Sequence, residues 1–104
     1  MEDDMIIDLF FERSEQAITE LSTKYGKLAQ VVCNNILGNS SDSEECVNDS
    51  LFKMWTSIPP NRPNSLYAYF VNIVRNKALD RYRRNLAVKR NSFYDVSIDE
   101  LEEC

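Results

Sequence analysis

The sequence contains no histidine, only two glycines and three prolines. Without histidine, the Ser/His/Asp and Cys/His sets that perform nucleophilic catalysis cannot be assembled. The glycines, Gly26 and Gly38, are isolated, so a glycine-rich loop that cradles phosphate groups is excluded as well. We therefore expect a binding protein rather than an enzyme, and no cofactor.

The cysteines and the distribution of apolar residues argue against a metalloprotein, a secreted protein and a membrane protein. Cys33, Cys46 and Cys104 are odd in number and lack metal-binding or disulfide spacing, so we expect buried or idle thiols in a reducing compartment and no metal site. The first residues, MEDDM, are acidic, which argues against a secretory signal. No apolar run approaches the roughly 18 residues of a membrane span. We expect a cytoplasmic protein with no membrane partner.

Helix-forming residues dominate the chain. Its 104 residues suit one domain with a modest core. Scarce glycine and proline favour long helices over a turn-rich β protein. We expect an all-α fold, a compact bundle of three to four helices within residues 1–90. A short helix is expected near residues 5–13, and Ser14 is predicted to cap a second one. Gly26 kinks or interrupts that helix, and Gly38 stops it.

A third helix is predicted after a turn at residues 39–41. The run Ser41-Asp42-Ser43-Glu44 has the pattern of a capping box with Ser41 as N-cap. The helix should reach about Ile58, and its apolar stripe places Trp55 in the core against the next helix. Outside this stripe lies an outer face that joins an aromatic to polar residues: Glu45, Asn48, Asp49 and Phe52. The pattern leaves open whether Phe52 is one exposed apolar residue or a protein contact.

The last helix follows a proline-stiffened loop at residues 57–64. Ser65 is its predicted N-cap, and Leu66, Phe70, Ile73, Val74 and Ala78 form its apolar side. The opposite side carries Asn72, Asn76 and Arg83. Beyond Leu79 the apolar track passes to Arg81 and Arg84, so the helix should leave the core there as a cationic projection. Asp80 can pair with Arg84, four residues later on the same helix.

Charge is segregated along the chain. Residues 1–61 contain four Lys/Arg and eleven Asp/Glu. Residues 62–90 contain eight Lys/Arg and one Asp, and residues 91–104 contain no Lys/Arg and five Asp/Glu. The net charges of −7, +7 and −5 sum to −5. Two readings remain open for the basic block: a helix end whose cations complement the helix dipole, or a patch that holds phosphate backbones.

Two segments and the spacing between them match the pattern of a known family: SDSEECVNDSLFKMW at residues 41–55 and AYFVNIVRNKALDRYRRN at residues 68–85. Together they resemble region 2 of bacterial RNA polymerase sigma factors of the sigma-70 family, nearest the small extracytoplasmic-function class. KYGKLAQVVCNNILGN, at residues 24–39, is similar to the family's preceding helix. Where the family often has Gln-Glu-Thr-Phe-Leu, this chain has Asn48-Asp49-Ser50-Leu51-Phe52, which shifts the aromatic to the outer face.

The resemblance implies a sigma factor domain that binds core polymerase and recognises and melts the promoter −10 element. The outer face of Glu45, Asn48, Asp49 and Phe52 would dock on the clamp coiled coil of the largest polymerase subunit. Residues 57–64 would pocket a flipped-out base, and Asp80 would orient an arginine or accept from a base amino group. The candidate contacts to the non-template strand are Arg62, Asn72, Arg75, Asn76, Asp80, Arg83 and Arg84. An anti-sigma factor is a further implied partner.

By the same resemblance, residues 91–104 would begin a linker to a missing helix-turn-helix domain, region 4, and the chain would be a fragment of a longer factor. Two other functions stay open. A double-strand DNA-binding regulator would need a helix-turn-helix pair with a three- to four-residue turn, and none precedes Leu66. A protein-only helical adaptor would make the basic block incidental.

Overall fold

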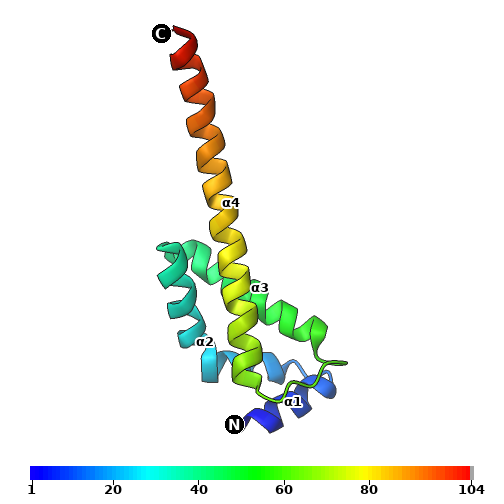
Figure 1. The fold of residues 1–104 in the computed structure, drawn as a ribbon. Coiled ribbons are helices and arrows are strands. Elements are labelled where there is room, and N and C mark those ends of the chain that lie inside the picture. Colours follow the sequence, from blue (N-terminus) through cyan, green and yellow to red (C-terminus); the bar gives the residue numbers. More distant parts are fainter. Residues whose placement is uncertain (104) are drawn as a thin grey trace.

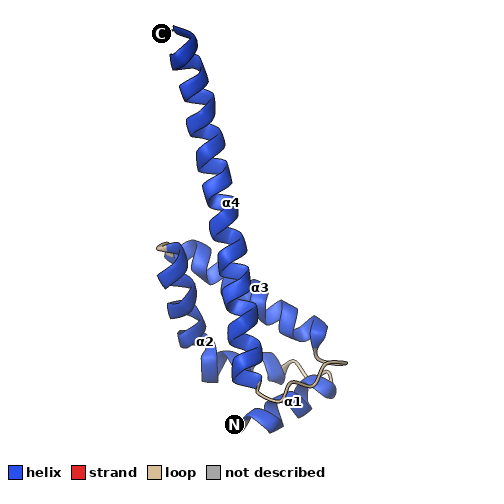
Figure 2. Cartoon of the chain, viewed as in Figure 1, coloured by secondary structure: helices blue, strands red, loops and turns tan. Residues whose placement is uncertain are grey.

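The computed structural model describes residues 1–103, and side chains within residues 1–90. This part of the chain forms four helices and no strand (Figures 1 and 2). They are α1 (Asp3–Phe11), α2 (Gln16–Leu37), α3 (Ser40–Ser57) and α4 (Leu66–Glu103). The predicted all-α fold is confirmed.

The core lies where α2, α3 and α4 pack on one another. The short α1 packs against α2 and α4 at the end of the core where α4 begins. Every helix contributes fully buried side chains, among them Ile6, Phe10, Leu21, Met54, Phe70 and Val74. Burying an apolar side chain of this size stabilises the fold by about 1.5–3 kcal/mol. The core therefore holds all four helices together.

The first turns of α4 belong to the core and the later ones project from it. Leu66, Phe70, Val74 and Ala78 recur every four residues and are buried, whereas most side chains from Asp80 to Arg90 are exposed. The predicted departure of this helix from the core is thus confirmed, and it gives the molecule a longest extent of 64 Å. The backbone of α4 continues past Arg90 to Glu103, while the acidic side chains expected there lie outside the described set.

Two of the predicted helix signals are confirmed. The Oγ of Ser65 accepts a hydrogen bond from the Ala68 N–H at 3.1 Å, as an N-cap does. Gly38 follows α2 with a φ of 63°, in the left-handed region that favours glycine, and its N–H donates to the Asn34 carbonyl. Gly26 lies inside a continuous α2 and does not break it.

The predicted start of α3 is wrong. Asn39 rather than Ser41 is the N-cap: its Oδ1 accepts from the Asp42 N–H at 2.9 Å, and α3 begins at Ser40. Asparagine caps a helix as well as serine does, and Asn39 has the extended backbone that an N-cap needs. The start of α2 also differs slightly, because Glu15 holds the cap position and Ser14 Oγ accepts from the Gln16 N–H.

The predicted placement of Trp55 in the core between α3 and α4 is also wrong. Trp55 is half-buried at the core's edge, with its ring centroid 6.3 Å from that of Phe10 in α1. The fully buried side of α3 is built from Ser43, Ser50 and Met54 instead. At 100° per residue, Trp55 lies about 120° around the helix from Ser43, so it reaches the neighbouring α1.

Candidate functional site

The outer face of α3, defined as Glu45, Asn48, Asp49 and Phe52, is exposed as predicted. These residues lie opposite the buried side of α3, so their side chains point away from the core. Phe52 is 68% exposed, which is unusual for an aromatic ring surrounded by polar residues.

A groove of about 550 Å³ runs beside this face, between α3 and the first half of α2. Asn48 and Phe52 from the outer face border it together with the more buried Leu51 and Trp55. Its α2 side consists of Glu15, Ile18 and Thr19. The sequence pattern of α3 alone did not point to this α2 contribution, because it depends on how the two helices pack.

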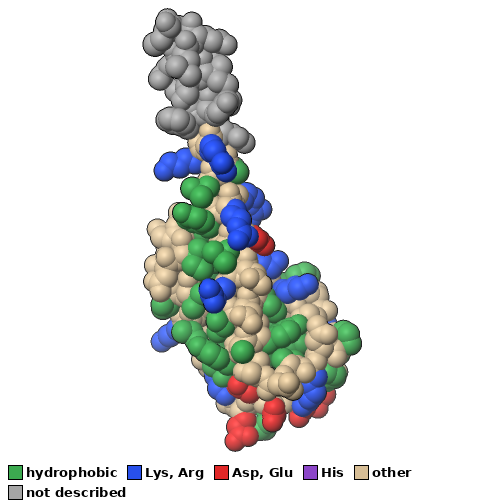
Figure 3. All heavy atoms as spheres, in the orientation of Figure 1, with side chains coloured by type: hydrophobic (Ala, Val, Ile, Leu, Met, Phe, Trp, Pro, Cys, Tyr) green, Lys and Arg blue, Asp and Glu red, His purple; other side chains and the backbone are tan. Residues whose placement is uncertain are grey.

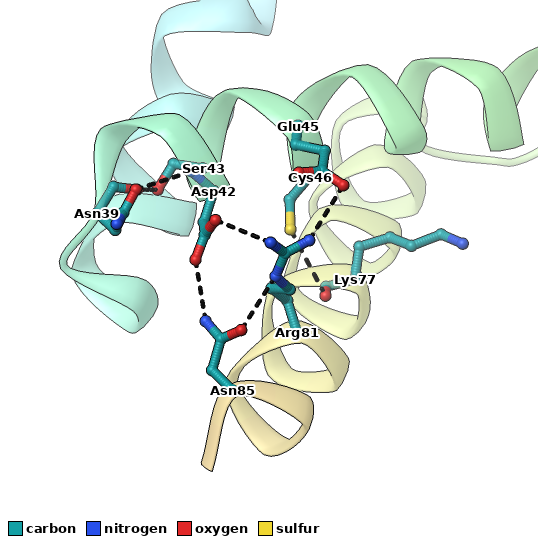
Figure 4. Close-up of polar contacts among 8 residues, drawn as sticks. All are labelled: Asn39, Asp42, Ser43, Glu45, Cys46, Lys77, Arg81 and Asn85. Carbon is teal, nitrogen blue, oxygen red and sulfur yellow. Dashed lines mark hydrogen bonds and ion pairs between the residues drawn. The ribbon is translucent and has the colours of Figure 1, made fainter. Parts of the chain in front are cut away.

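Glu45 differs from the other three residues of the outer face. Its Oε1 lies 3.0 Å from Arg81 Nη1 of α4, and its side chain remains 56% exposed (Figure 4). This carboxylate is therefore already engaged by a cation within the chain, whereas the pattern of α3 suggested only an outward acid.

The exposed face of α4 brings together most of the predicted nucleic-acid contacts. Asn72, Asn76 and Arg83 lie within about 40° of one another around the helix, opposite its buried stripe. Arg75 and Asp80 are exposed on either side of this set, whereas Arg84 is exposed further round the helix, on the track of the buried stripe where α4 has left the core. In the space-filling view, Lys and Arg side chains follow α4 outward while most Asp and Glu gather at the opposite end (Figure 3).

Asp80 pairs with Arg83 rather than with Arg84, although the spacing allows either pair. Asp80 Oδ1 lies 3.3 Å from Arg83 Nη1, one residue earlier in the chain. Positions three and four residues apart are both neighbours on a helix, so sequence spacing does not choose between them. Both partners are more than 70% exposed, so this pair adds little stability and leaves Arg83 open to an anion.

Arg62 is less free than Arg83 to bind an anion. Its Nη2 lies 2.9 Å from Asp8 Oδ1, and its guanidinium carbon is 5.3 Å from the Phe11 ring centroid, both in α1. The structure thus pairs this candidate with the end of α1, although its side chain remains 48% exposed.

Tyr69 attaches the loop to α4. Its hydroxyl donates to Ser57 Oγ at 3.0 Å and accepts from Asn61 Nδ2 at 3.2 Å. Tyr69 precedes Asn72 by three residues on the same side of α4, so it joins residues 57–64 to the exposed face. The sequence search for site residues missed Tyr69, and its helical spacing from Asn72 and Asn76 was the available signal.

Arg81 is not the projecting cation that was expected. Only 20% of its side chain is exposed, because it folds onto α3 and makes ion pairs with Asp42 and Glu45 (Figure 4). The hydrogen bond to Glu45, with the nearby Asp42 charge, raises the pKa of Arg81 against a smaller opposing effect of burial. This guanidinium is therefore a structural cation.

Comparison with known protein families gives a match that spans both surfaces. The family model for sigma-70 region 2 matches residues 21–87, from the second turn of α2 through α3 and the loop to the projecting part of α4. The matched segment thus contains both exposed faces. Neither the curated proteins nor the solved structures gave a match. Within the described part of the chain, every helix is too short or too polar to cross a membrane.

Proposed function

The chain belongs to the sigma-70 region 2 family, and from this we propose that it is the region 2 domain of an extracytoplasmic-function sigma factor. The family consists of transcription factor domains rather than enzymes. The proposed role is to bind core RNA polymerase through α3 and to recognise and melt the promoter −10 element through α4. The match over residues 21–87 carries this proposal, because it covers both surfaces.

Support for the polymerase contact comes from the outer face of α3. Aromatic residues are enriched at protein interfaces, so the exposed ring of Phe52 favours a protein contact on this otherwise polar face. The adjoining groove offers room for a partner side chain beside Phe52. The partner we propose is the clamp coiled coil of the largest polymerase subunit.

Support for the DNA contact comes from the exposed face of α4. Guanidinium groups such as Arg83 and Arg84 bind phosphates without regard to sequence, whereas amides such as Asn72 and Asn76 can read base edges. The loop that Tyr69 holds beside them forms an edge against which an unstacked base can rest. We propose that this edge captures the non-template strand and thereby favours melting.

The domain boundaries follow as proposals. Residues 1–90 would be the region 2 domain, and residues 91–104 would begin a linker to a helix-turn-helix domain. Such a factor would act in the cytoplasm, and an anti-sigma factor would be a further partner.

Of the two other functions, the double-strand DNA-binding regulator is disfavoured. Residues 58–65 separate α3 from α4, and this connection is longer than the turn of a helix-turn-helix pair. The adaptor differs in predicting no DNA binding.

The decisive experiment is a binding measurement between the chain and bacterial core polymerase. We expect the parent chain to bind, and Asp49→Lys and Phe52→Ala to weaken binding by about 1–3 kcal/mol. Neither side chain is buried, so circular dichroism should show unchanged helix content. Matched controls are Glu44→Lys for the charge reversal and Val31→Ala for the loss of an exposed apolar side chain.

The outcomes separate the proposals. A parent chain that does not bind core polymerase would reject the sigma factor function. If the parent binds and both outer-face variants bind equally well, the contact lies elsewhere and the assignment to α3 is wrong.

A further inference from the structure

A ring of side chains joins α4 to the start of α3, just beyond the point where α4 leaves the core. Arg81 Nη2 lies 2.9 Å from Asp42 Oδ1, and Asn85 Nδ2 lies 2.9 Å from Asp42 Oδ2. Arg81 Nε donates to Asn85 Oδ1 at 3.1 Å, which closes the ring (Figure 4). We call Asp42, Arg81 and Asn85 the clasp.

The geometry of the clasp distinguishes it from an ordinary surface ion pair. Both oxygens of Asp42 are occupied, and the side chains of Asp42 and Arg81 are each only 20% exposed. Charge-assisted hydrogen bonds from a planar guanidinium fix direction as well as distance. By contrast, the exposed pair between Asp80 and Arg83 constrains neither partner strongly.

The clasp also has a rigid support. Asp42 lies in the first turn of α3, where its own N–H is held by the Asn39 cap and its charge suits the positive end of the helix. Ser43, the next residue, is fully buried and donates to the Asn39 carbonyl. Asp42 is thus fixed to the body of the protein through the start of α3.

Apart from the ion pair between Arg81 and the half-exposed Glu45 of α3, the clasp makes the only hydrogen bonds between the described side chains of α4 beyond Ala78 and another helix. Within the described side chains, which end at Arg90, Ala78 is the last buried residue of α4, and the clasp reaches α4 at Arg81 and Asn85, up to two turns further out. Arg83 and Arg84 lie between these two attachment points. Their position relative to the body of the protein therefore depends on the clasp.

We propose that Asp42 and Asn85, acting through Arg81, are positioning residues for the nucleic-acid contacts of Arg83 and Arg84. This inference rests on the proposed function, because it presumes that the exposed face of α4 binds DNA. None of the three clasp residues belongs to the predicted contact set, and Asp42, an acid on another helix, would normally be expected to repel DNA.

This expected repulsion lets the experiment distinguish an effect of the Asp42 charge from a positioning effect. If Asp42 acted only through its charge, Asp42→Ala would strengthen DNA binding, as should Glu44→Ala, which removes an exposed acid two residues away. If Asp42 positions α4, Asp42→Ala should instead weaken binding by roughly 3- to 30-fold. Asn85→Ala changes no charge and should also weaken binding.

The experiment measures fluorescence anisotropy of a labelled single strand carrying a −10 element, with core polymerase present, for the parent and the three variants. Backbone ¹H–¹⁵N heteronuclear NOE values for residues 79–90 are measured on the free chain. We expect them to fall in Asp42→Ala and Asn85→Ala and to stay unchanged in Glu44→Ala. Circular dichroism melting confirms that each variant is folded.

The inference is overturned if the parent binds DNA and Asp42→Ala binds as tightly as Glu44→Ala. A clasp variant that loosens residues 79–90 without losing affinity overturns it too. Should the parent fail to bind DNA even with core polymerase, the proposed function itself fails and the positioning role falls with it. Asn85→Ala keeps the test valid if Asp42→Ala does not fold.

Discussion

The guanidinium carbon of Arg13 lies 3.7 Å from the ring centroid of Trp55. The same group donates through Nη1 to the carbonyl oxygens of Trp55 and Ile58, at 2.8 and 3.0 Å. The last carbonyls of a helix have no partner within it, and the negative end of the helix dipole favours a cation there. Arg13 therefore closes the end of α3 and fixes the turn between α1 and α2 against it.

Replacing Arg13 with alanine should lower the free energy of unfolding by about 1–3 kcal/mol, through the lost cation–π contact and hydrogen bonds. Arg13 has a φ of 57°, a left-handed conformation that costs a non-glycine residue roughly 1–2 kcal/mol. Arg13→Gly loses the same contacts but relieves that strain, so it should be less destabilising than Arg13→Ala. Urea denaturation measures both.

Arg75→Ala is the matched control, because Arg75 is an exposed arginine on α4. Its effect should stay within about 0.5 kcal/mol. An Arg13→Ala variant as stable as Arg75→Ala would mean that the contacts with Trp55 and Ile58 do not stabilise the fold.

Helical periodicity predicted the buried side of α4 correctly, because Leu66, Phe70, Val74 and Ala78 are apolar and evenly spaced. It misplaced Trp55 for a physical reason. The inward side of α3 contains Ser43 and Ser50, whose buried hydroxyls bond to carbonyls of Asn39 and Cys46 four residues earlier. A pattern that counts only apolar residues does not recognise such serines as core.

For the candidate site, too, helical periodicity predicts one part of the arrangement and misses another. That Asn72, Asn76 and Arg83 share an exposed face follows from spacing along one helix. Spacing also places Arg81 on the track of the buried stripe, but it does not predict the ion pairs of Arg81, because Asp42 and Glu45 lie far away in the sequence and meet it only through the packing of α3 on α4. Local periodicity therefore predicts on which side of a helix a residue lies, but not which charges are already paired.

Stability should fall in acid through Asp3. Lys24 Nζ lies 2.6 Å from Asp3 Oδ1, and the Tyr25 hydroxyl donates to the same carboxylate. Burial acts to raise the pKa of Asp3, but the hydrogen bonds from Lys24 and Tyr25 and the positive charges of Lys24 and the amino terminus together outweigh it, so the pKa lies below the usual 3.8. A folded-state pKa below the unfolded one contributes stability above about pH 4, which is lost as the pH falls through the folded value.

Urea denaturation between pH 2 and pH 7 tests this expectation. Asp3→Asn should be less stable than the parent at neutral pH and should lose less stability on acidification. Asp4→Asn, at an exposed neighbouring position, is the control and should follow the parent. Identical pH profiles for Asp3→Asn and the parent would show that the contacts of Asp3 do not stabilise the folded state.

The buried thiols should be inert. Burial, with a smaller effect from nearby Cys46, raises the pKa of Cys33 to about 11. Burial also raises the pKa of Cys46. Because the thiolate is the reactive form, neither should react with a thiol reagent at pH 8 while the chain is folded. In a Cys104→Ser variant, which removes the cysteine outside the described residues, urea should expose two reactive thiols. Fast labelling without urea would contradict the buried placement.

The exposed face of α4 should contribute to DNA binding in two separable ways. Arg83→Ala should lower affinity for every sequence, because a phosphate contact carries no sequence information, whereas Asn76→Ala should mainly reduce the preference between sequences. Arg62→Ala should cost less than Arg83→Ala, since the ion pair of Arg62 with Asp8 is shorter and less exposed than that of Arg83 with Asp80. Anisotropy with single strands of −10 and scrambled sequence, with core polymerase present, measures all three.

The salt dependence of the same binding reports how many cations reach phosphates. Three or four contacts from α4 should give a slope of log K against log salt of about −2 to −3, at roughly −0.7 per contact on a single strand. Arg83→Ala should make that slope shallower by about one contact, while Asn76→Ala should leave it unchanged. Binding that does not depend on salt, or that survives Arg83→Ala intact, would mean that these arginines only complement the helix end, as cations near a helix carboxyl terminus commonly do.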